Sequence, residues 1–311
     1  MFICLPVLAG NFQKGREAYI IGDYGVALKE WIPLAHEGDA SAQYNLGLMY
    51  FHGKGVPQDY VKALKWYTLS AQQGIEDAQY NLGDMYYNGK GINQNYEQAL
   101  KWYTLSAKQG HISAAHNLGI MYDQGLGVLE DDRVAVKWYT LSANQGNASA
   151  QYNLGVMYDQ GLGVLEDDRV AVKWYTLSAN QGNAFAQVNL GSMYDNGHGV
   201  FEDDRIAVGW YSLSADQGNA IAQFNLGNMY RRGQGVLREG KTAVKWYALS
   251  AEQGNVSAQL NLGYMYATGQ GVLKDNVYAH MWWDIAASNG SKNGKDNRDI
   301  VAQNMTFSQI E

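Results

Sequence analysis

The chain contains 311 residues, of which 46% are hydrophobic and 17% are charged. This balance is typical of a soluble folded protein and excludes a disordered or collagen-like chain. The formal net charge is -7 and there is no run of basic residues, so a surface that neutralises nucleic-acid phosphates is not expected. No apolar stretch approaches the ~20 residues that cross a bilayer. We therefore expect neither a nucleic-acid partner nor a membrane span.

The first residues, 1–10, form an apolar leader. Phe2 to Ala9 resembles the end of a signal-peptide apolar region and finishes on a small residue, although a basic start is missing. We favour export to the periplasm or beyond over a cytoplasmic location; the alternative is a disordered apolar leader. Cys4 is the only cysteine, so we expect no disulfide, no Cys-based metal site and no thiol nucleophile in the rest of the chain.

Glycine and tryptophan recur along the chain with a constant spacing of 36 residues. The glycines are Gly47, Gly83, Gly119, Gly155, Gly191, Gly227 and Gly263, and the tryptophans are Trp66, Trp102, Trp138, Trp174, Trp210, Trp246 and Trp282. A fixed period of this length predicts a tandem array of helical repeats, each of which buries its apolar face against its neighbours. We expect seven repeats over 39–290, a divergent helix pair over 11–38 and a capping helix over 291–311.

The residue pattern of each repeat predicts two helices joined by glycine-containing turns. In the first helix Ala42, Leu46 and Met49 fall on one face. Asp59 precedes the second helix and can accept its free N–H groups, and its counterparts Asn95, Asp131, Asp167, Asp203 and Asp275 are capping types too, whereas repeat six has Glu239. Gly47 lies in the middle of the first helix, where glycine costs about 1 kcal/mol relative to alanine. We therefore expect a close approach of the neighbouring helix at this glycine.

Several strings carry a family resemblance. Gln43-x-x-Leu46-Gly47-x-x-Tyr50 followed by Ala63-x-x-x-Tyr67 resembles a tetratricopeptide helix pair, but the period is two residues longer than about 34. The Gly-x-Gly-Val loop and the Ala-Val-Lys-Trp-Tyr and Ala-x-Gln-Gly strings resemble the Sel-1-like repeat family more closely, over residues 39–290. The resemblance implies an all-α fold, an α/α superhelical solenoid of right-handed twist with a concave and a convex side. It also implies a non-enzymatic scaffold or adaptor that assembles protein complexes.

Comparison between the repeats separates constant from variable positions. The first helix varies at the positions of Tyr44, Leu48, Phe51 and His52, and the corresponding face of tetratricopeptide-like arrays lines the concave groove. The resulting candidates for binding a protein or peptide partner are Tyr44, Leu48, Phe51, Tyr80, Asp84, Tyr87, His116, Ile120, Asp123, Tyr152, Val156, Asp159, Val188, Asp195, Phe224, Arg231 and Arg232. Aromatic residues come first, acidic residues follow and a basic pair comes last, which predicts a peptide with basic residues near its middle. The alternative is that exposed positions simply drift.

Two further series recur in every repeat. Trp66 and its equivalents alternate with small residues, so we expect them in the core rather than in a carbohydrate-stacking or cation–π ladder. Asn45 and its equivalents can bind a ligand backbone or satisfy a carbonyl group between helices, and we favour the hydrogen bond to a carbonyl.

Two local motifs have a structural interpretation that outweighs the functional one. The trios Glu130-Asp131-Asp132, Glu166-Asp167-Asp168 and Glu202-Asp203-Asp204 offer oxygen ligands for calcium, but each lies where a second helix starts and the helix dipole favours negative charge. The string from Gly235 to Thr242 satisfies Gly-x4-Gly-Lys-Thr, yet it joins two predicted helices instead of following a strand, so we interpret it as a chance match.

We expect no enzyme, no cofactor and no bound metal, because hydrolase motifs such as Ser-x-x-Lys and His-Glu-x-x-His are absent from the sequence. Residues 121–148 and 157–184 are identical, and a scaffold tolerates such a duplication better than a distributed active site does. The alternatives are a β-lactamase-like hydrolase of the cysteine-rich branch of the family, a carbohydrate or cell-wall-fragment binder that uses Tyr80, Tyr87 and Tyr152, and a secreted effector. We expect a monomer, although stacked ends could pair.

Overall fold

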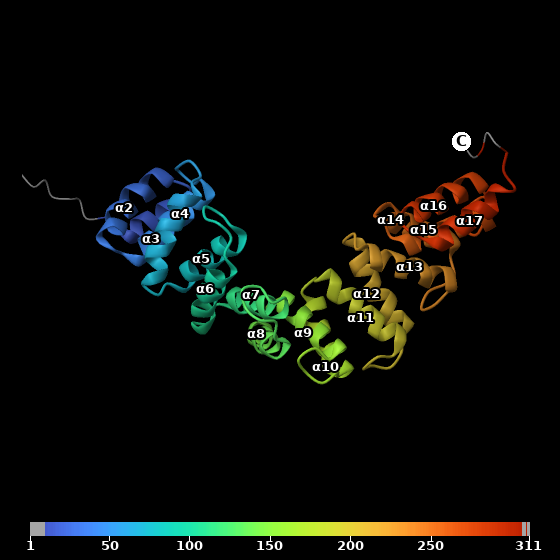
Figure 1. Cartoon of the computed structure of the whole chain (residues 1–311), viewed down its shortest axis with the longest axis horizontal. Helices are drawn as coiled ribbons and strands as arrows, with labels where there is room; N and C mark the ends of the chain where they lie inside the picture. The colour runs from blue at the N-terminus through green and yellow to red at the C-terminus, as the bar shows by residue number, and fades with distance from the viewer. Residues whose placement is uncertain (1–9, 307–308, 310–311) are drawn as a thin grey trace, which may run out of the picture. The chain divides into compact units, whose positions relative to one another are not determined.

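The structure is a computed structural model that describes residues 10–306 and 309, and these residues form 17 α-helices and no strand (Figure 1). This confirms the predicted all-α solenoid of stacked helical repeats. Residues 1–9, with Cys4 and most of the expected leader, lie outside the described residues, as do 307, 308, 310 and 311. In the described part, no helix is long and apolar enough to cross a membrane.

The chain divides into two compact units. The first extends to Ala150 and includes Leu162–Val164; the second comprises Gln151–Gly161 and the residues from Leu165 onward. The first unit holds α1 (Phe12–Ile20), α2 (Tyr24–Glu37), α3 (Ala40–His52), α4 (Tyr60–Gln72), α5 (Glu76–Asn88), α6 (Tyr96–Lys108), α7 (Ile112–Asp123) and α8 (Asp132–Asn144). The second holds most of α9 (Ala148–Gln160), and α10 (Asp168–Asn180), α11 (Ala184–Asn196), α12 (Asp204–Asp216), α13 (Ala220–Arg232), α14 (Gly240–Glu252), α15 (Val256–Thr268), α16 (Asn276–Ser288) and α17 (Lys292–Ala302).

Short polar side chains start the second helix of most repeats. Asp59 accepts a hydrogen bond from the backbone N–H of Lys62 at 2.9 Å. The other predicted caps make the same contact at their own helices: Asn95, Asp131, Asp167, Asp203 and Asp275. This confirms the capping role, because each cap satisfies an N–H group that has no partner within the helix. At α14 the side chain of Glu239 makes no cap bond and instead accepts from the hydroxyl of Thr242 at 2.9 Å.

Each repeat closes around one glycine and one aromatic ring. A Cβ on Gly47 would lie 2.5 Å from the ring of Tyr67, which is itself fully buried. The same contact pairs Gly83 with Tyr103, Gly119 with Tyr139, Gly155 with Tyr175, Gly191 with Tyr211 and Gly227 with Tyr247. This confirms the predicted close approach of the second helix, and the buried ring offsets the cost of a glycine in mid-helix.

Tryptophan contributes less to the core than its periodicity predicts. Only Trp66 of the series is buried, and its six equivalents are half-buried, because the adjacent tyrosine occupies the space between the helices. At the two ends of the array a tryptophan from outside the series takes the tyrosine's place. A Cβ on Gly15 would lie 2.5 Å from the indole nitrogen of Trp31, and a Cβ on Gly263 would lie 2.5 Å from that of Trp283.

Buried polar side chains join the helices. Ser70 in α4 donates to the carbonyl of Ala40 at the start of α3 over 2.7 Å, and Ser106, Ser142, Ser214 and Ser250 make the same bond in their own repeats. Gln79 in α5 donates to the carbonyl of Ala71 in α4 at 3.1 Å. The serine therefore fixes the two helices of one repeat, and the glutamine ties a repeat to the one before it.

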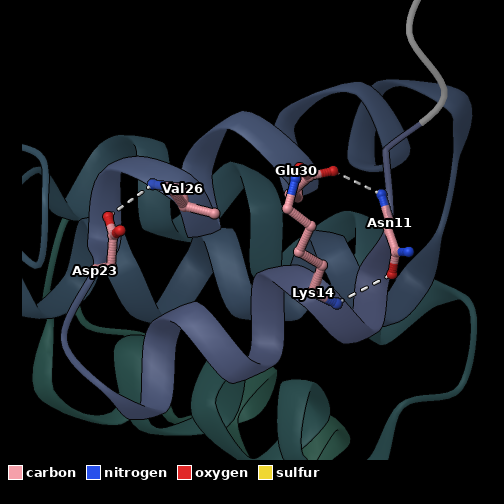
Figure 2. Close-up of polar contacts among 5 residues, drawn as sticks. All are labelled: Asn11, Lys14, Asp23, Val26 and Glu30. Atoms are coloured by element: carbon pink, nitrogen blue, oxygen red, sulfur yellow. Dashed lines mark hydrogen bonds and ion pairs between the residues drawn. The ribbon is translucent and has the colours of Figure 1, made fainter.

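Ahead of the first repeat, Glu30 holds the helix pair α1 and α2 together (Figure 2). Its carboxylate accepts from Lys14 Nζ at 2.6 Å and from the backbone N–H of Asn11 at 2.9 Å. These two hydrogen bonds lower the pKa of Glu30. Asp23 caps α2 by accepting from the N–H of Val26 at 3.1 Å.

Candidate functional site

The candidate site is the set of first-helix positions that differ between repeats, here called the variable face. It comprises the positions of Tyr44, Leu48, Phe51 and His52 and their equivalents in the other six repeats. These positions lie on α3, α5 and α7 in the first unit and on α9, α11, α13 and α15 in the second unit. In repeats one to six its first three positions surround the buried tyrosine of their own repeat, and in repeat seven Trp283 takes the place of that tyrosine. The fourth position is exposed in every repeat.

The first position covers the ring of that tyrosine. The ring centroids of Tyr44 and Tyr67 are 6.0 Å apart, and similar distances separate Tyr80 from Tyr103, His116 from Tyr139, Tyr152 from Tyr175 and Phe224 from Tyr247. These side chains are half-buried. The face is therefore less exposed than the repeat comparison predicts, because its aromatic residues lie against the core.

Val188 departs furthest from the predicted exposure. It occupies the first position in repeat five, is only 7% exposed and packs in the cluster around Tyr211. A valine is too short to reach past the tyrosine ring, so it stays in the core. Val188 is therefore a core residue and offers almost no surface to a partner.

The second position supplies a partner for the tyrosine hydroxyl in two repeats. Asp84 accepts a hydrogen bond from Tyr103 Oη, and Asn228 accepts from Tyr247 Oη at 2.7 Å. Leu48, Ile120 and Val156 are half-buried apolar residues at this position, Ser192 is half-buried and Tyr264 is exposed. The residue at this position therefore decides whether the hydroxyl has an acceptor there or an apolar neighbour.

The residue at the third position also contacts the buried tyrosine, either through its hydroxyl or through its ring. Asp123, Asp159 and Asp195 accept from Tyr139, Tyr175 and Tyr211 at 3.2, 3.0 and 3.4 Å, and Arg231 donates from Nε to Tyr247 Oη at 3.1 Å. Phe51 and Tyr87 instead present rings at 6.3 Å from the buried tyrosine ring. The candidates for recognising a basic partner are thus also hydrogen-bonded to the framework.

The recurring asparagine reaches this network from the next repeat. Asn117 donates to the Asp84 carboxylate at 3.4 Å, and Asn261 donates to the Asn228 side-chain oxygen at 3.3 Å. Asn45, which has only the helix pair α1 and α2 before it, donates to the carbonyl of Ser41 in its own helix at 2.9 Å. The predicted hydrogen bond to a carbonyl between helices is therefore wrong at Asn117, whose partner is a carboxylate, and at Asn45, whose partner lies in the same helix. At Asn261 the acceptor is a side-chain carbonyl of another helix.

Burial sets the electrostatics of the face. It raises the pKa of Asp84, Asp123 and Asp195 above the ordinary aspartate value, and the tyrosine hydroxyls that donate to them oppose the shift. Burial also raises the pKa of Tyr80 to about 12 and lowers the pKa of His116. Burial therefore shifts each of these groups towards its uncharged form.

A small hollow opens at Asp84. Its volume is about 160 Å³, and it is lined by Asp84, Tyr87, Asn88, Tyr103, Asn117 and Ile120. Tyr80 stands beside it, stacked on His111 with ring centroids 4.4 Å apart. A hollow of this size takes one side chain, and the carboxylate at its wall would accept a cationic one.

The exposed fourth position forms the rim of the face. It holds His52, Asn88, Gln124, Gln160, Asn196, Arg232 and Thr268. Arg232 donates to Gln234 at 3.4 Å, so its guanidinium lies near the following loop. These side chains can be changed without disturbing the core, which makes the rim the natural place for probes.

The remaining sequence motifs lie at helix starts and in an inter-helix loop of the repeats. The acidic trios start α8, α10 and α12, and their middle aspartates are the helix caps. In the described residues no group of three or more His, Cys, Asp or Glu side chains is placed to hold a metal. The phosphate-loop string runs from Gly235 in an inter-helix loop into the first turn of α14, which follows a helix, α13.

Sequence reasoning missed the tyrosine hydroxyls, which organise the polar part of the face. The signal was present, since tyrosine recurs at 36-residue steps from Tyr67 to Tyr247 and asparagine from Asn45 to Asn261. Taken alone, the tyrosine series or the asparagine series indicates only helix packing. The polar network that they share is visible only in the structure, where their side chains meet around the same acceptors.

Comparison with known proteins agrees with this repeat structure. The Sel1 repeat model matches residues 40–75, 76–111, 112–147, 148–183, 184–219, 220–255 and 256–291. A Sel1 repeat protein from Oxalobacter formigenes is 33% identical with a TM-score of 0.71, and the match covers 92% of this chain and 84% of that one. The protein c5321, a protective antigen present in uropathogenic Escherichia coli strains and displaying an SLR fold, is 31% identical with a TM-score of 0.50, covering 95% of this chain and 81% of that one.

No curated protein is significantly similar to the chain. Seven consecutive family matches, each built on the same glycine and aromatic contact, nevertheless span most of the sequence. The chain therefore belongs to the Sel1 repeat family.

Proposed function

We propose that the protein is a non-enzymatic scaffold or adaptor that binds a protein or peptide through its variable face. Sel1 repeats commonly mediate protein–protein interaction, which supports the class of function. The observation that carries the proposal is that side chains change identity around a constant framework. Ala42, Leu46, Gly47 and Met49 are repeated in all seven units, whereas the positions of Leu48 and Phe51 alternate between apolar, acidic, amide and basic groups.

The partner that fits best carries basic residues. Asp123, Asp159 and Asp195 keep a carboxylate at the third position of three successive repeats, and Asp84 lines a hollow that holds one side chain. The aromatic residues beside them, Tyr80 among them, add flat surfaces that suit lysine stems and guanidinium groups. We infer that these carboxylates select the partner, while the aromatic residues supply contact area.

A charge-neutral variant tests the proposal. Asp123→Asn/Asp159→Asn/Asp195→Asn removes three charges, and asparagine keeps an oxygen that can accept from each tyrosine hydroxyl. Affinity capture from source-cell extract with this variant and with the unchanged protein should show a partner that the variant retains less well. A control that removes exposed charges elsewhere, Asp216→Asn/Glu252→Gln, should retain the partner fully. Equal retention by all three proteins would refute the role of the variable face.

A further inference from the structure

A second surface of the second unit displays large apolar side chains that the fold does not use. Leu165, Phe201, Leu237 and Leu273 occupy the same position of the loop between the two helices of their repeats, and all are at least 90% exposed. Scattered exposed apolar residues are ordinary on proteins. Here, however, four successive repeats expose one at the same position, and such an arrangement marks a contact surface.

Glycine contacts fix where these loops lie. A Cβ on Gly199 would lie 2.5 Å from the backbone of Asp168, and one on Gly235 would lie 2.3 Å from the carbonyl oxygen of Asp204. The loops of Phe201, Leu237 and Leu273 therefore rest on the first turn of the second helix in the preceding repeat. We call the row of loops and helix starts formed in this way the loop edge.

The loop edge brings an apolar side chain to an acidic helix start. The loop that carries Phe201 rests beside Glu166, Asp167 and Asp168, and the loop that carries Leu237 rests beside the trio that ends at Asp204. Leu273 is different, because its loop rests on the start of α14, where Arg238 and Gly240 replace the glutamate and the last aspartate of the trio.

An open hollow lies at the first of these junctions. It has a volume of about 970 Å³, and its walls include Glu166 and Asp168 on one side and Phe201, Glu202 and Ile206 on the other. This volume is at the upper end of the range for small-molecule sites, and the open shape suits a chain segment. Both α10 and α12 contribute to it, so two repeats build the site together.

The charge of the hollow is strongly one-sided. Five carboxylates line it, those of Glu166, Asp167, Asp168, Glu202 and Asp203, against the single guanidinium of Arg169. Asp167 and Asp203 accept from helix N–H groups. Among the described residues neither Glu166 nor Glu202 forms an ion pair.

We propose that the loop edge between α10 and α12 binds a basic, amphipathic segment of a partner protein, separately from the variable face. An apolar side chain of the segment packs against Phe201 and Ile206, and flanking lysine or arginine side chains pair with Glu166 and Glu202. Charge complementarity selects this occupant, because the carboxylates repel an anionic membrane surface and an acidic peptide alike. The proposal does not depend on the proposed function of the variable face.

A pair of synthetic peptides provides the test. A fluorescein-labelled peptide of alternating lysine and leucine is titrated with the full chain, and fluorescence anisotropy is compared with that of a glutamate–leucine peptide of equal length. We expect the basic peptide to bind and the acidic one not to bind. Phe201→Ser, and separately Glu166→Gln/Glu202→Gln, should each weaken binding by about tenfold or more, as expected for central anchors.

Matched controls decide whether the site is specific. Leu273→Ser removes the equivalent side chain from a basic junction, and Asp216→Asn/Glu252→Gln removes two exposed charges elsewhere; each should leave the affinity unchanged. Equal weakening by the charge control would overturn the proposal in favour of non-specific attraction. Binding that Phe201→Ser leaves intact and Asp159→Asn abolishes would overturn it by placing the peptide on the variable face. Phe201-dependent binding to phosphatidylglycerol vesicles, without peptide binding, would overturn it in favour of a lipid surface.

Discussion

Gly155 lies against the ring of Tyr175, where a Cβ on the glycine would be 2.6 Å from two ring carbons. Because the ring is fully buried between the two helices of the repeat, it has no free direction in which to retreat. The same pair, one backbone without a side chain and one ring, recurs in six repeats. The spacing of the helices is therefore set by this contact rather than by the more conspicuous tryptophans.

Replacing this glycine tests the contact. Gly155→Ala should lower the free energy of unfolding by about 1–3 kcal/mol, the usual cost of forcing an extra carbon into a packed core. Chemical denaturation, followed by the circular dichroism of the helices, measures the change. An unchanged or raised unfolding midpoint would contradict the account of the core.

A second glycine in mid-helix supplies the matched control. Gly209 lies within α12, and a Cβ there would meet no atom within 4 Å. Gly209→Ala should therefore stabilise the protein, by up to about 1 kcal/mol, through the better helix propensity of alanine. Opposite signs for the two alanine variants are the expected result, and equal signs would show that packing does not distinguish the positions.

The hydroxyl of Tyr175 ties the variable face to the core. It donates to Asp159 at 3.0 Å, so Tyr175→Phe should cost about 1 kcal/mol, the usual net value of one hydrogen bond, while the ring contact with Gly155 remains. A double-mutant cycle with Asp159→Ala measures the coupling between the two side chains. Additive losses would mean that the hydrogen bond contributes nothing to stability.

The raised pKa of Asp84 predicts a pH-dependent stability. Since burial raises the folded pKa above the unfolded one, the folded chain binds this proton more tightly, and the ionised carboxylate destabilises the fold at pH values above the folded pKa. Asp84→Asn should therefore stabilise the protein at pH 7, and the gain should shrink as the pH falls through the folded pKa towards the unfolded one. Asn228, which accepts from Tyr247 in the equivalent place, shows that an amide fits.

Thermal unfolding of both proteins across the acid range measures this effect. A gain that is independent of pH would assign the stabilisation to something other than the charge. A loss of stability at pH 7 would mean that the ionised form, held by Tyr103, is the favoured one.

Periodicity predicts most of the fold. The 36-residue step, the capping residues and the mid-helix glycines predict the helices, their order and the close contact at Gly47. It does not predict which aromatic residue enters that contact. Trp66 and Tyr67 recur with the same period on neighbouring helix positions, and only the direction of each side chain, which depends on how the helices cross, separates them.

The two surfaces were predictable to different degrees. Variation between repeats locates the variable face, but it treats Val188 as exposed, because burial at that position depends on the length of the side chain. The loop edge lies in loops, where no helical spacing of residues marks a face. Phe201 lies near Glu166 only because Gly199 lets the loop that carries Phe201 pack on α10. A contact between residues of different repeats requires the structure.

The central claim is that the variable face binds a protein partner, and site-specific photo-crosslinking tests it most directly. A photoreactive amino acid placed at Asn196, on the exposed rim of α11, leaves the core intact, and the same amino acid at Asp216, exposed at the end of α12, serves as control. After irradiation in source-cell extract, we predict a protein adduct from position 196 that position 216 does not give. Adducts of equal yield from both positions, or an adduct from position 216 alone, would contradict the claim.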